Sequence, residues 1–260
     1  MPKLNWDGND FRNPQDSSGT VTDNISRSGN LQQGYKHGSL TEGLLAYYPM
    51  DEGSGSTAFD KALDNDGTIN GASWNSNPKL GDSCLSFDGS DNYVNAGDIL
   101  YGDNLTICAW VRPDSVTGVD DHSAVYSNND NNAGDGFAVT AYEQGNWYFY
   151  HASEFVEGPS VNTGEWTHLM ILISEGNFFK AYVNGQKVGE IDVSGNGNTI
   201  DTAYNTWIGS VPNGGNSQNN PFSGLIDEVR IYERRLSEPE INALHELTAP
   251  SKIDAGDTLN

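Results

Sequence analysis

The most telling segment of the chain is Phe222-Ser-Gly-Leu-Ile-Asp-Glu-Val-Arg-Ile-Tyr-Glu-Arg-Arg-Leu-Ser-Glu-Pro-Glu-Ile241. In its first half, apolar residues recur close to every second position, which is typical of a strand with one buried face. In its second half, Ser237 and Glu240 have the spacing of a capping box, a pair of side chains that caps the start of a helix. We therefore predict a strand followed directly by a helix over residues 237–247, the only helix that the sequence indicates. The alternating apolar residues are Leu225, Val229 and Ile231.

Upstream of this segment, short apolar runs alternate with turn residues. Residues 171–191 form three such runs, and the last two are separated by Asn184-Gly185. Asn-Gly is a strong signal for a two-residue β-hairpin, because both positions need a positive φ. Residues 137–142 and 147–150 indicate a second hairpin. We count about a dozen strands joined by turns and no strand–helix–strand unit, which predicts an all-β protein built as an antiparallel sandwich.

The sequences of several segments resemble those of a known family. Residues 222–241 closely resemble the C-terminal signature of laminin-G-like domains, which are concanavalin A-like lectin/glucanase jelly rolls. The segment Gly43-Leu-Leu-Ala-Tyr-Tyr-Pro-Met-Asp-Glu-Gly-Ser-Gly-Ser-Thr-Ala58 resembles the first strand and first loop of that family. The resemblance implies an antiparallel two-sheet jelly roll whose first and last strands pair, but this fold hosts many functions. Further matches, in the order of the family, are Leu85-Ser-Phe-Asp-Gly89, Leu105-Thr-Ile-Cys-Ala-Trp-Val111, Trp166-Thr-His-Leu169 and Tyr182-Val-Asn-Gly-Gln186.

The two ends of this resemblance divide the chain into three parts. We predict a polar N-terminal arm over residues 1–42, a jelly-roll domain over residues 43–247 and a polar tail over residues 248–260. The arm is rich in Gly, Ser and Asn, yet it carries scattered large apolar residues. We expect it either to lie along a partner subunit or to fold back on its own domain.

The chain is strongly acidic, with 36 Asp and Glu residues against 13 Lys and Arg residues and a net charge of −23. Nucleic acids and anionic membranes require clustered cations, so this balance argues against both as partners. No segment approaches the ~20 apolar residues that cross a bilayer, and the N-terminus shows no apolar run of a signal peptide. Because salt screens the repulsion among carboxylates, a halophilic origin is one explanation of the charge and ordinary solubility is the other.

Two cysteines, Cys84 and Cys108, are too few for a disulfide scaffold. Both lie in predicted strands, so we expect buried free thiols, with a single bridge as the alternative.

The nearest approach to a catalytic motif is Glu190-Ile-Asp-Val-Ser-Gly195. Glycosidases of this fold carry three carboxylates on one strand, where alternation places them on one face. Here Ser and Gly occupy the third place, so only Glu190 and Asp192 remain, and both fit a solvent-facing strand end. None of the five histidines lies in a nucleophile or zinc motif, and the resemblance gives His168 a scaffold role. We therefore predict no catalytic residues and no enzyme activity.

Calcium is the cofactor that the carboxylates suggest, because hard cations prefer several carboxylate and carbonyl oxygens. Asp51 follows the first strand, and we expect Asp227 to open the last one. If these strands pair as in the family, the two carboxylates lie close together, and Ca²⁺ between them would relieve their repulsion. Asp60, Asp66 and Asp88 lie in neighbouring loops and are further candidate ligands. The alternative is that these aspartates cap turns.

Sugar binding requires an aromatic platform beside amides and carboxylates. Alternation puts Trp147 and Phe149 on one face of their strand and Tyr148 and Tyr150 on the other, so one pair is expected to face away from the core. The alternative is that aromatic residues fill the core, as we expect for Trp110, Trp166 and Trp207. The candidate ligand-binding residues, including those of two loops rich in Asn, are Trp147, Tyr148, Tyr150, Asn129, Asp130, Asn213 and Asn216.

Three functions fit these features: a glycan recognition or adhesion module, a structural assembly protein docked by its arm, and a glycan-active enzyme. The missing third carboxylate argues against the enzyme. Jelly rolls of this type mostly work outside cells, and a virion protein needs no signal peptide because particles leave when the cell lyses. We therefore predict a virion surface protein (capsid decoration, turret, spike or tail) whose arm contacts other copies or other virion proteins and whose jelly roll binds host glycans or glycoproteins. The alternative is a secreted or cell-surface carbohydrate-active enzyme or its carbohydrate-binding module.

Overall fold

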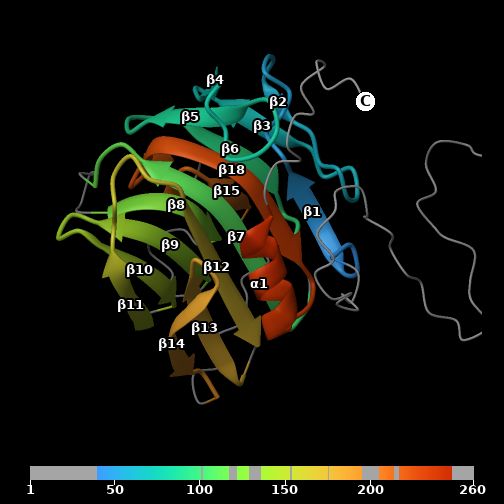
Figure 1. Cartoon of the computed structure of the whole chain (residues 1–260), viewed down its shortest axis with the longest axis vertical. Helices are drawn as coiled ribbons and strands as arrows, with labels where there is room; N and C mark the ends of the chain where they lie inside the picture. Colours follow the sequence, from blue (N-terminus) through green and yellow to red (C-terminus); the bar gives the residue numbers. More distant parts are fainter. Residues whose placement is uncertain are drawn as a thin grey trace, which may run out of the picture. The chain divides into compact units, whose positions relative to one another are not determined.

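The structure is a computed structural model that describes residues 40–100, 102–116, 122–128, 136–152, 154–174, 176–194, 205–213 and 217–247. Within these ranges it contains eighteen strands and one helix. Most of the strands form two antiparallel sheets that pack face to face, and the helix lies against the outside of one of them (Figure 1). The predicted all-β jelly-roll sandwich is confirmed, with more and shorter strands than the dozen expected.

The first sheet holds the two terminal strands. Its members are β1 (Leu44–Tyr48), β4 (Ser73–Asn75), β5 (Cys84–Asp88), β7 (Asn104–Pro113), β12 (Thr167–Ser174), β13 (Phe178–Val183), β14 (Gln186–Asp192) and β18 (Ser223–Tyr232). They are ordered β14–β13–β12–β7–β18–β5–β4, and β1 pairs with β18. Ala46 lies opposite Ile231 in that pair, so the expected pairing of the first and last strands is confirmed.

The second sheet forms the other layer. Its members are β2 (Thr57–Ala58), β3 (Gly67–Asn70), β6 (Tyr93–Gly97), β8 (His122–Asn128), β9 (Phe137–Tyr142), β10 (Asn146–His151), β11 (Glu154–Ser160) and β15 (Thr206–Ile208). They are ordered β11–β10–β9–β8–β15–β6–β3–β2. Strands β16 (Val211–Asn213) and β17 (Ser217–Asn219) form a separate two-stranded sheet.

The hairpin turns form where the sequence predicts them. Asn184 and Gly185 have φ angles of 49° and 75°, and they connect β13 directly to β14 in antiparallel register. Positive φ at both positions is the requirement of a type I′ turn. The predicted hairpin of β9 and β10 also forms, with Phe149 opposite Val139.

The main core lies between the two sheets and is built from side chains that alternate inward. Each large apolar side chain buried in this way contributes about 1.5–3 kcal/mol relative to exposure. Cys84 and Cys108 are buried free thiols, as expected. Trp110 and Trp207 are buried and Trp166 is partly buried, which agrees with packing roles. The largest fully buried side chains of the main core include Tyr48, Phe87, Phe137, Trp147, Phe149 and Phe179.

A second, smaller apolar cluster lies on the outer face of the first sheet, where α1 (Glu238–Glu246) covers it (Figure 1). Ile241 and Leu244 of the helix pack against Met170 of β12 and Tyr232 of β18. The predicted helix is confirmed, with Ser237 as its N-cap residue. No helix in the described ranges is both long and apolar enough to span a membrane.

One expectation about β18 is wrong. Asp227 does not open the last strand but lies in its middle, because the strand begins at Ser223. The register against β7 shifts between Asp227 and Arg230, and Glu228 in this bulge has a φ of 56°. The bulge orients Glu228 so that its carboxylate forms a buried 2.6 Å ion pair with Arg230. The Tyr47 hydroxyl of β1 donates a hydrogen bond to the same carboxylate. Such an arrangement ties the two terminal strands together beside Asp227.

Candidate functional site

The outer face of the second sheet carries a group of aromatic side chains from four adjacent strands. We call this group the aromatic patch, and it consists of His122 (β8), Tyr142 (β9), Tyr148 and Tyr150 (β10) and Phe155 (β11). The four residues from β8, β9 and β10 are partly exposed, and Phe155 is 50% exposed. Because monomeric proteins rarely leave many apolar rings together on a surface, such a patch indicates a binding face.

Strand alternation explains which rings reach this face. Along β10, Trp147 and Phe149 are 1% and 0% exposed and belong to the main core, whereas Tyr148 and Tyr150 point outward. The expected place of Trp147 in a ligand platform is therefore corrected, because its side chain fills the space between the sheets. The prediction that one of the two pairs faces outward is confirmed for Tyr148 and Tyr150.

Cross-strand register brings the rings of the patch into contact. Phe155 lies opposite Tyr150 in the β10–β11 pair, and its ring centroid is 5.0 Å from that of Tyr148. The rings of Tyr148 and Tyr142 are also 5.0 Å apart, and His122 is 4.6 Å from Tyr142. These separations are typical of favourable aromatic pairs, so the rings hold one another in place.

Polar groups border the rings. Glu157, opposite Tyr148 on β11, accepts a 2.6 Å hydrogen bond from the Asn146 side chain. Partial desolvation by its neighbours raises the pKa of Tyr148, and the nearby Glu157 carboxylate raises it further. Burial likewise raises the pKa of Tyr150 to about 12. Both phenols are therefore neutral hydroxyl groups at neutral pH, able to donate and accept hydrogen bonds.

Sequence reasoning missed four members of this site: His122, Tyr142, Phe155 and Glu157. Alternation along β8, β9 and β11 would have assigned each of them a face, but their proximity to Tyr148 follows only from the pairing of the strands. The candidate residues Asn129, Asp130 and Asn216 lie outside the described residues, as does the side chain of Asn213. Their role in binding stays a prediction.

Among the candidate calcium ligands, Asp60 is fully used by the backbone. Its two carboxylate oxygens accept hydrogen bonds of 2.7–3.0 Å from the N–H groups of Tyr47, Ala62, Leu63 and Asn65. A carboxylate offers about four acceptor sites, so Asp60 caps its turn and has no lone pair left for a cation. Here the structure agrees with the turn-capping alternative.

Asp66 and Asp88 also act in turns. Asp66 accepts a hydrogen bond from the backbone of Asp60, and Asp88 accepts one from Ser90. Both carboxylates are exposed.

Asp51 and Asp227 both contact the backbone of residues 79–83. Asp227 accepts hydrogen bonds from the backbone of Lys79 and Leu80 through Oδ2, and Asp51 accepts them from Asp82 and Ser83 through Oδ1. Asp227 Oδ1 is buried without a hydrogen-bond partner, which fits a cation ligand. No group of three or more His, Cys, Asp or Glu side chains is arranged for a metal within the described ranges. Calcium between these two carboxylates stays a prediction.

The Glu190 and Asp192 pair is not arranged for acid catalysis. Glu190 lies 3.0 Å from Lys187 and 3.8 Å from Lys180, and hydrogen bonds from Ser194 lower the pKa of Asp192. A general acid needs a raised pKa, so Asp192 is not suited to protonate a leaving group, and Glu190 is paired with two lysines.

His168 is a buried scaffold residue. It is 2% exposed, its ring lies 5.0 Å from that of Trp110, and its backbone N–H donates to Asn184 at the β13–β14 turn. Burial, with further lowering by His245, brings its pKa to about 3. The imidazole is therefore neutral at physiological pH, in agreement with the expected structural role.

Solved structures with the same fold include binding domains and parts of enzymes. Domain 4 of AbnA, an extracellular GH43 arabinanase from Geobacillus stearothermophilus, solved with arabinotriose, matches with a TM-score of 0.60 and 21% identity over 78% of this chain and 98% of that one. A mutant sialidase of Trypanosoma rangeli matches with a TM-score of 0.61 and 18% identity, over 79% of this chain but 33% of the sialidase. The receptor-binding domain of botulinum neurotoxin D matches with a TM-score of 0.60 and 13% identity, over 80% of this chain and 53% of that domain.

At these identities the likeness concerns the fold alone. No curated protein sequence matches the chain. The family model described as the concanavalin A-like lectin/glucanase superfamily matches residues 88–242, more than half of the chain. With the two-sheet jelly roll described above, this match establishes that the chain belongs to the concanavalin A-like lectin/glucanase superfamily.

Proposed function

We propose that this domain is a non-catalytic glycan-recognition module and that the aromatic patch is its ligand face. The observation that carries the proposal is the outward clustering of Tyr142, Tyr148, Tyr150 and Phe155 on adjacent strands. Aromatic rings contact the apolar faces of sugars, and phenols and carboxylates bind their hydroxyl groups. Glu157 and the two β10 tyrosines provide such groups at the border of the rings.

The similarity to solved structures supports the same class of function. One solved structure that this chain matches over 98% of that structure's length is an arabinanase domain in complex with arabinotriose. A domain of this size and fold thus exists as a module of a carbohydrate-active enzyme. The second candidate function for this chain is therefore that of a carbohydrate-binding module in such an enzyme. The chain spans only about a third of the sialidase, so that protein's activity is not carried over.

Placement on a virion surface stays a prediction. The arm expected to contact other copies or other virion proteins falls almost entirely within residues 1–39, outside the described residues. The aromatic patch also supports a host-attachment role, because it offers a binding face in any protein or particle that contains this domain.

The test is binding of the purified chain to a panel of neutral oligosaccharides, comparing the double variant Tyr148→Ala/Tyr150→Ala with Phe59→Ala. Phe59 is 45% exposed but lies in a loop outside the patch, so it controls for loss of an exposed ring. Contacts between two aromatic rings contribute about 0.5–1.5 kcal/mol beyond their buried area, and we assume the same order for a ring against the apolar face of a sugar. We therefore expect the double variant to bind at least about tenfold more weakly and Phe59→Ala to bind as the parent does. Equal binding by the two variants would contradict the proposal.

A further inference from the structure

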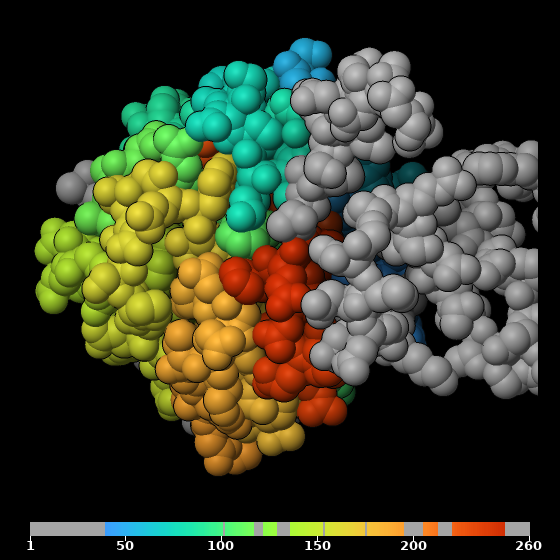
Figure 2. All heavy atoms as spheres, in the orientation of Figure 1, coloured from blue at the N-terminus to red at the C-terminus, as the bar shows by residue number. Residues whose placement is uncertain are grey.

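A groove lies on the opposite side of the sandwich from the aromatic patch, between β13 and the beginning of α1. Its volume is about 430 Å³. Figure 2 shows the surface of residues 178–192 (orange) beside that of α1 (red), and the groove lies where these surfaces meet. The residues used below are Leu172, Phe178, Lys180, Tyr182, Arg235 and Glu238, all of which line it.

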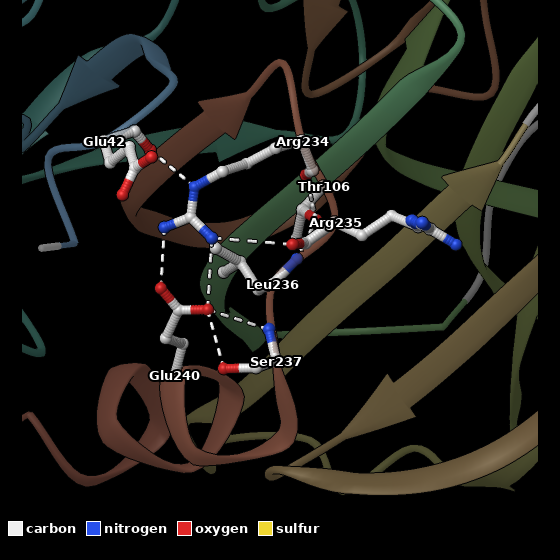
Figure 3. Close-up of polar contacts among 7 residues, drawn as sticks. All are labelled: Glu42, Thr106, Arg234, Arg235, Leu236, Ser237 and Glu240. Carbon is white, nitrogen blue, oxygen red and sulfur yellow. Dashed lines mark hydrogen bonds and ion pairs between the residues drawn. The ribbon is translucent and has the colours of Figure 1, made fainter. Parts of the chain in front are cut away.

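Two cations from different elements converge on one ring of this groove. Lys180 Nζ lies 4.0 Å from the centroid of the Phe178 ring, and the guanidinium carbon of Arg235 lies 5.7 Å from the same centroid. Figure 3 shows the Arg235 side chain extending away from the neighbouring polar network. Within the described part of the chain, its guanidinium group has no hydrogen bond or ion pair, and its contact is with Phe178. Two cationic side chains beside one ring, of which Arg235 has no counter-ion among the described residues, favour a bound anion near them.

The carboxylates of the groove are already engaged. Glu240 is paired with Arg234 at 2.7 Å and also accepts hydrogen bonds from Ser237 (Figure 3). Glu238 accepts a 3.0 Å hydrogen bond from the Tyr182 hydroxyl. Neither carboxylate forms an ion pair with Arg235 in the described part of the chain, whereas Lys180 has Glu190 at 3.8 Å.

The concentration of cations here is unusual for so acidic a chain. The structure describes eight Lys and Arg residues. Two of them, Lys180 and Arg235, line the groove. Two more pair with neighbouring carboxylates: Lys187 shares Glu190 with Lys180, and Arg234 pairs with Glu240, which lines the groove.

We propose that this groove binds a sugar carrying a carboxylate, such as a uronic acid residue of an acidic polysaccharide. The carboxylate would bind Lys180 and Arg235, and the apolar face of the sugar ring would lie on the floor formed by Leu172 and Phe178. A volume of 430 Å³ exceeds what a single small anion requires. The Tyr182 hydroxyl and Glu238 supply hydrogen-bonding partners for sugar hydroxyl groups, which a simple fatty acid would leave unused.

The test measures binding of trigalacturonic acid by calorimetry at pH 6 and low ionic strength. Its fully methyl-esterified form is the matched ligand, because it keeps the sugar rings and removes the charge. The variants are Arg235→Gln and Lys180→Gln, and Lys187→Gln is the matched control, because it removes a nearby cation that does not line the groove. Thermal melting checks that each variant is folded.

We expect saturable binding of the acid, binding of the ester at least tenfold weaker, and about tenfold losses in Arg235→Gln and Lys180→Gln, because each loses a charge-assisted hydrogen bond. Lys187→Gln should stay within threefold of the parent. The proposal is overturned by no saturable binding, by equal binding of acid and ester, or by an equal loss in Lys187→Gln, which would indicate non-specific attraction.

The groove and the aromatic patch are tested separately. The double variant Tyr148→Ala/Tyr150→Ala should keep its affinity for trigalacturonic acid, and loss of that affinity would place the acid on the patch and reject the groove. Conversely, failure of neutral oligosaccharides to bind the patch leaves the expectations for the groove unchanged.

Discussion

At the scale of single residues, Asp227 is the most unusual group of the domain. The residue is 0% exposed, and only one of its two carboxylate oxygens has hydrogen-bond partners. Burial raises its pKa to about 8, and the charges of Glu228 and Asp51 add to this effect, although the N–H groups of Leu80 and Lys79 oppose it. In metal-free protein the folded state therefore holds Asp227 largely protonated at neutral pH, which is the opposite of an ordinary surface aspartate.

This reversal predicts a specific pH dependence of stability. Because the folded pKa of about 8 lies above the unfolded value of about 3.9, the folded state binds the proton more tightly. The stabilisation is complete below pH 4 and is lost as pH rises toward 8. Asp227→Asn removes the titration, so in EDTA the melting temperature of the parent should fall by several degrees relative to the variant between pH 4 and pH 8. A constant difference across this range would show that Asp227 is not protonated in the folded protein.

The same variant tests the predicted calcium site. Ca²⁺ would compete with the proton for Asp227, so we expect added Ca²⁺ to raise the melting temperature of the parent, more at pH 8 than at pH 5. Binding to the folded state alone stabilises a protein by mass action. Asp227→Asn should lose this response, and Asp103→Asn, which changes an exposed carboxylate that is not a candidate ligand, should keep it. The calcium prediction fails if the parent shows no response at either pH.

At the scale of elements, α1 is attached by a largely buried ion pair in addition to its apolar face. The Arg234 guanidinium donates to the Glu42 carbonyl before β1 and to both carboxylate oxygens of Glu240 (Figure 3). Burial alone would raise the pKa of Glu240, but hydrogen bonds from Arg234 and Ser237 outweigh it and lower the pKa to about 2. A single carboxylate thus connects the helix start to the chain segment that precedes the first strand.

We expect Glu240→Gln to lower the free energy of unfolding at pH 7 by about 1–3 kcal/mol, because it leaves the Arg234 charge without its partner. The folded pKa lies below the ordinary glutamate value of 4.5, so this contribution is present above pH 4.5 and is lost as pH falls toward 2. Denaturant unfolding at pH 7 and pH 3 should therefore show a smaller difference from the parent at pH 3. Glu246→Gln, on the exposed end of the same helix, should be close to neutral at both pH values.

At the scale of the whole molecule, charge is the dominant feature. A net charge of −23 repels itself, and because few cations are present, most carboxylates have no ion-pair partner to offset the repulsion. At physiological ionic strength the screening length is about 8 Å, and it shortens to about 3 Å at 1 M salt. Stability should therefore rise with salt.

We expect the melting temperature to increase between 0.05 and 1 M NaCl by calorimetry, with a smaller increase in the triple variant Asp103→Asn/Glu233→Gln/Glu246→Gln. These three side chains are exposed, so the variant changes charge and little else. If the melting temperatures of parent and variant rose equally with salt, the rise would come from ion-specific solvation. That result would remove the electrostatic argument for a halophilic origin.

The sequence by itself determined the features that depend on near neighbours along the chain. The hairpin at Asn184-Gly185 follows from its need for positive φ, and α1 follows from the spacing of Ser237 and Glu240. The separation of Trp147 from Tyr148 follows from strand alternation. The order of the family segments was enough to predict the two-sheet jelly roll and the pairing of β1 with β18.

Only the tertiary structure decided which of the alternating faces is outward and which distant groups meet. Trp147 and Tyr148 are both aromatic, and their sequence alone does not say which one faces inward. Trp147 faces inward because the first sheet covers that side of β10. Asp227 has its partners in residues 79–80, and Arg235 meets Phe178, because strands distant in sequence pair in one sheet. Local pattern carries no information on such contacts, since burial and charge pairing depend on the whole packed arrangement rather than on neighbours in the sequence.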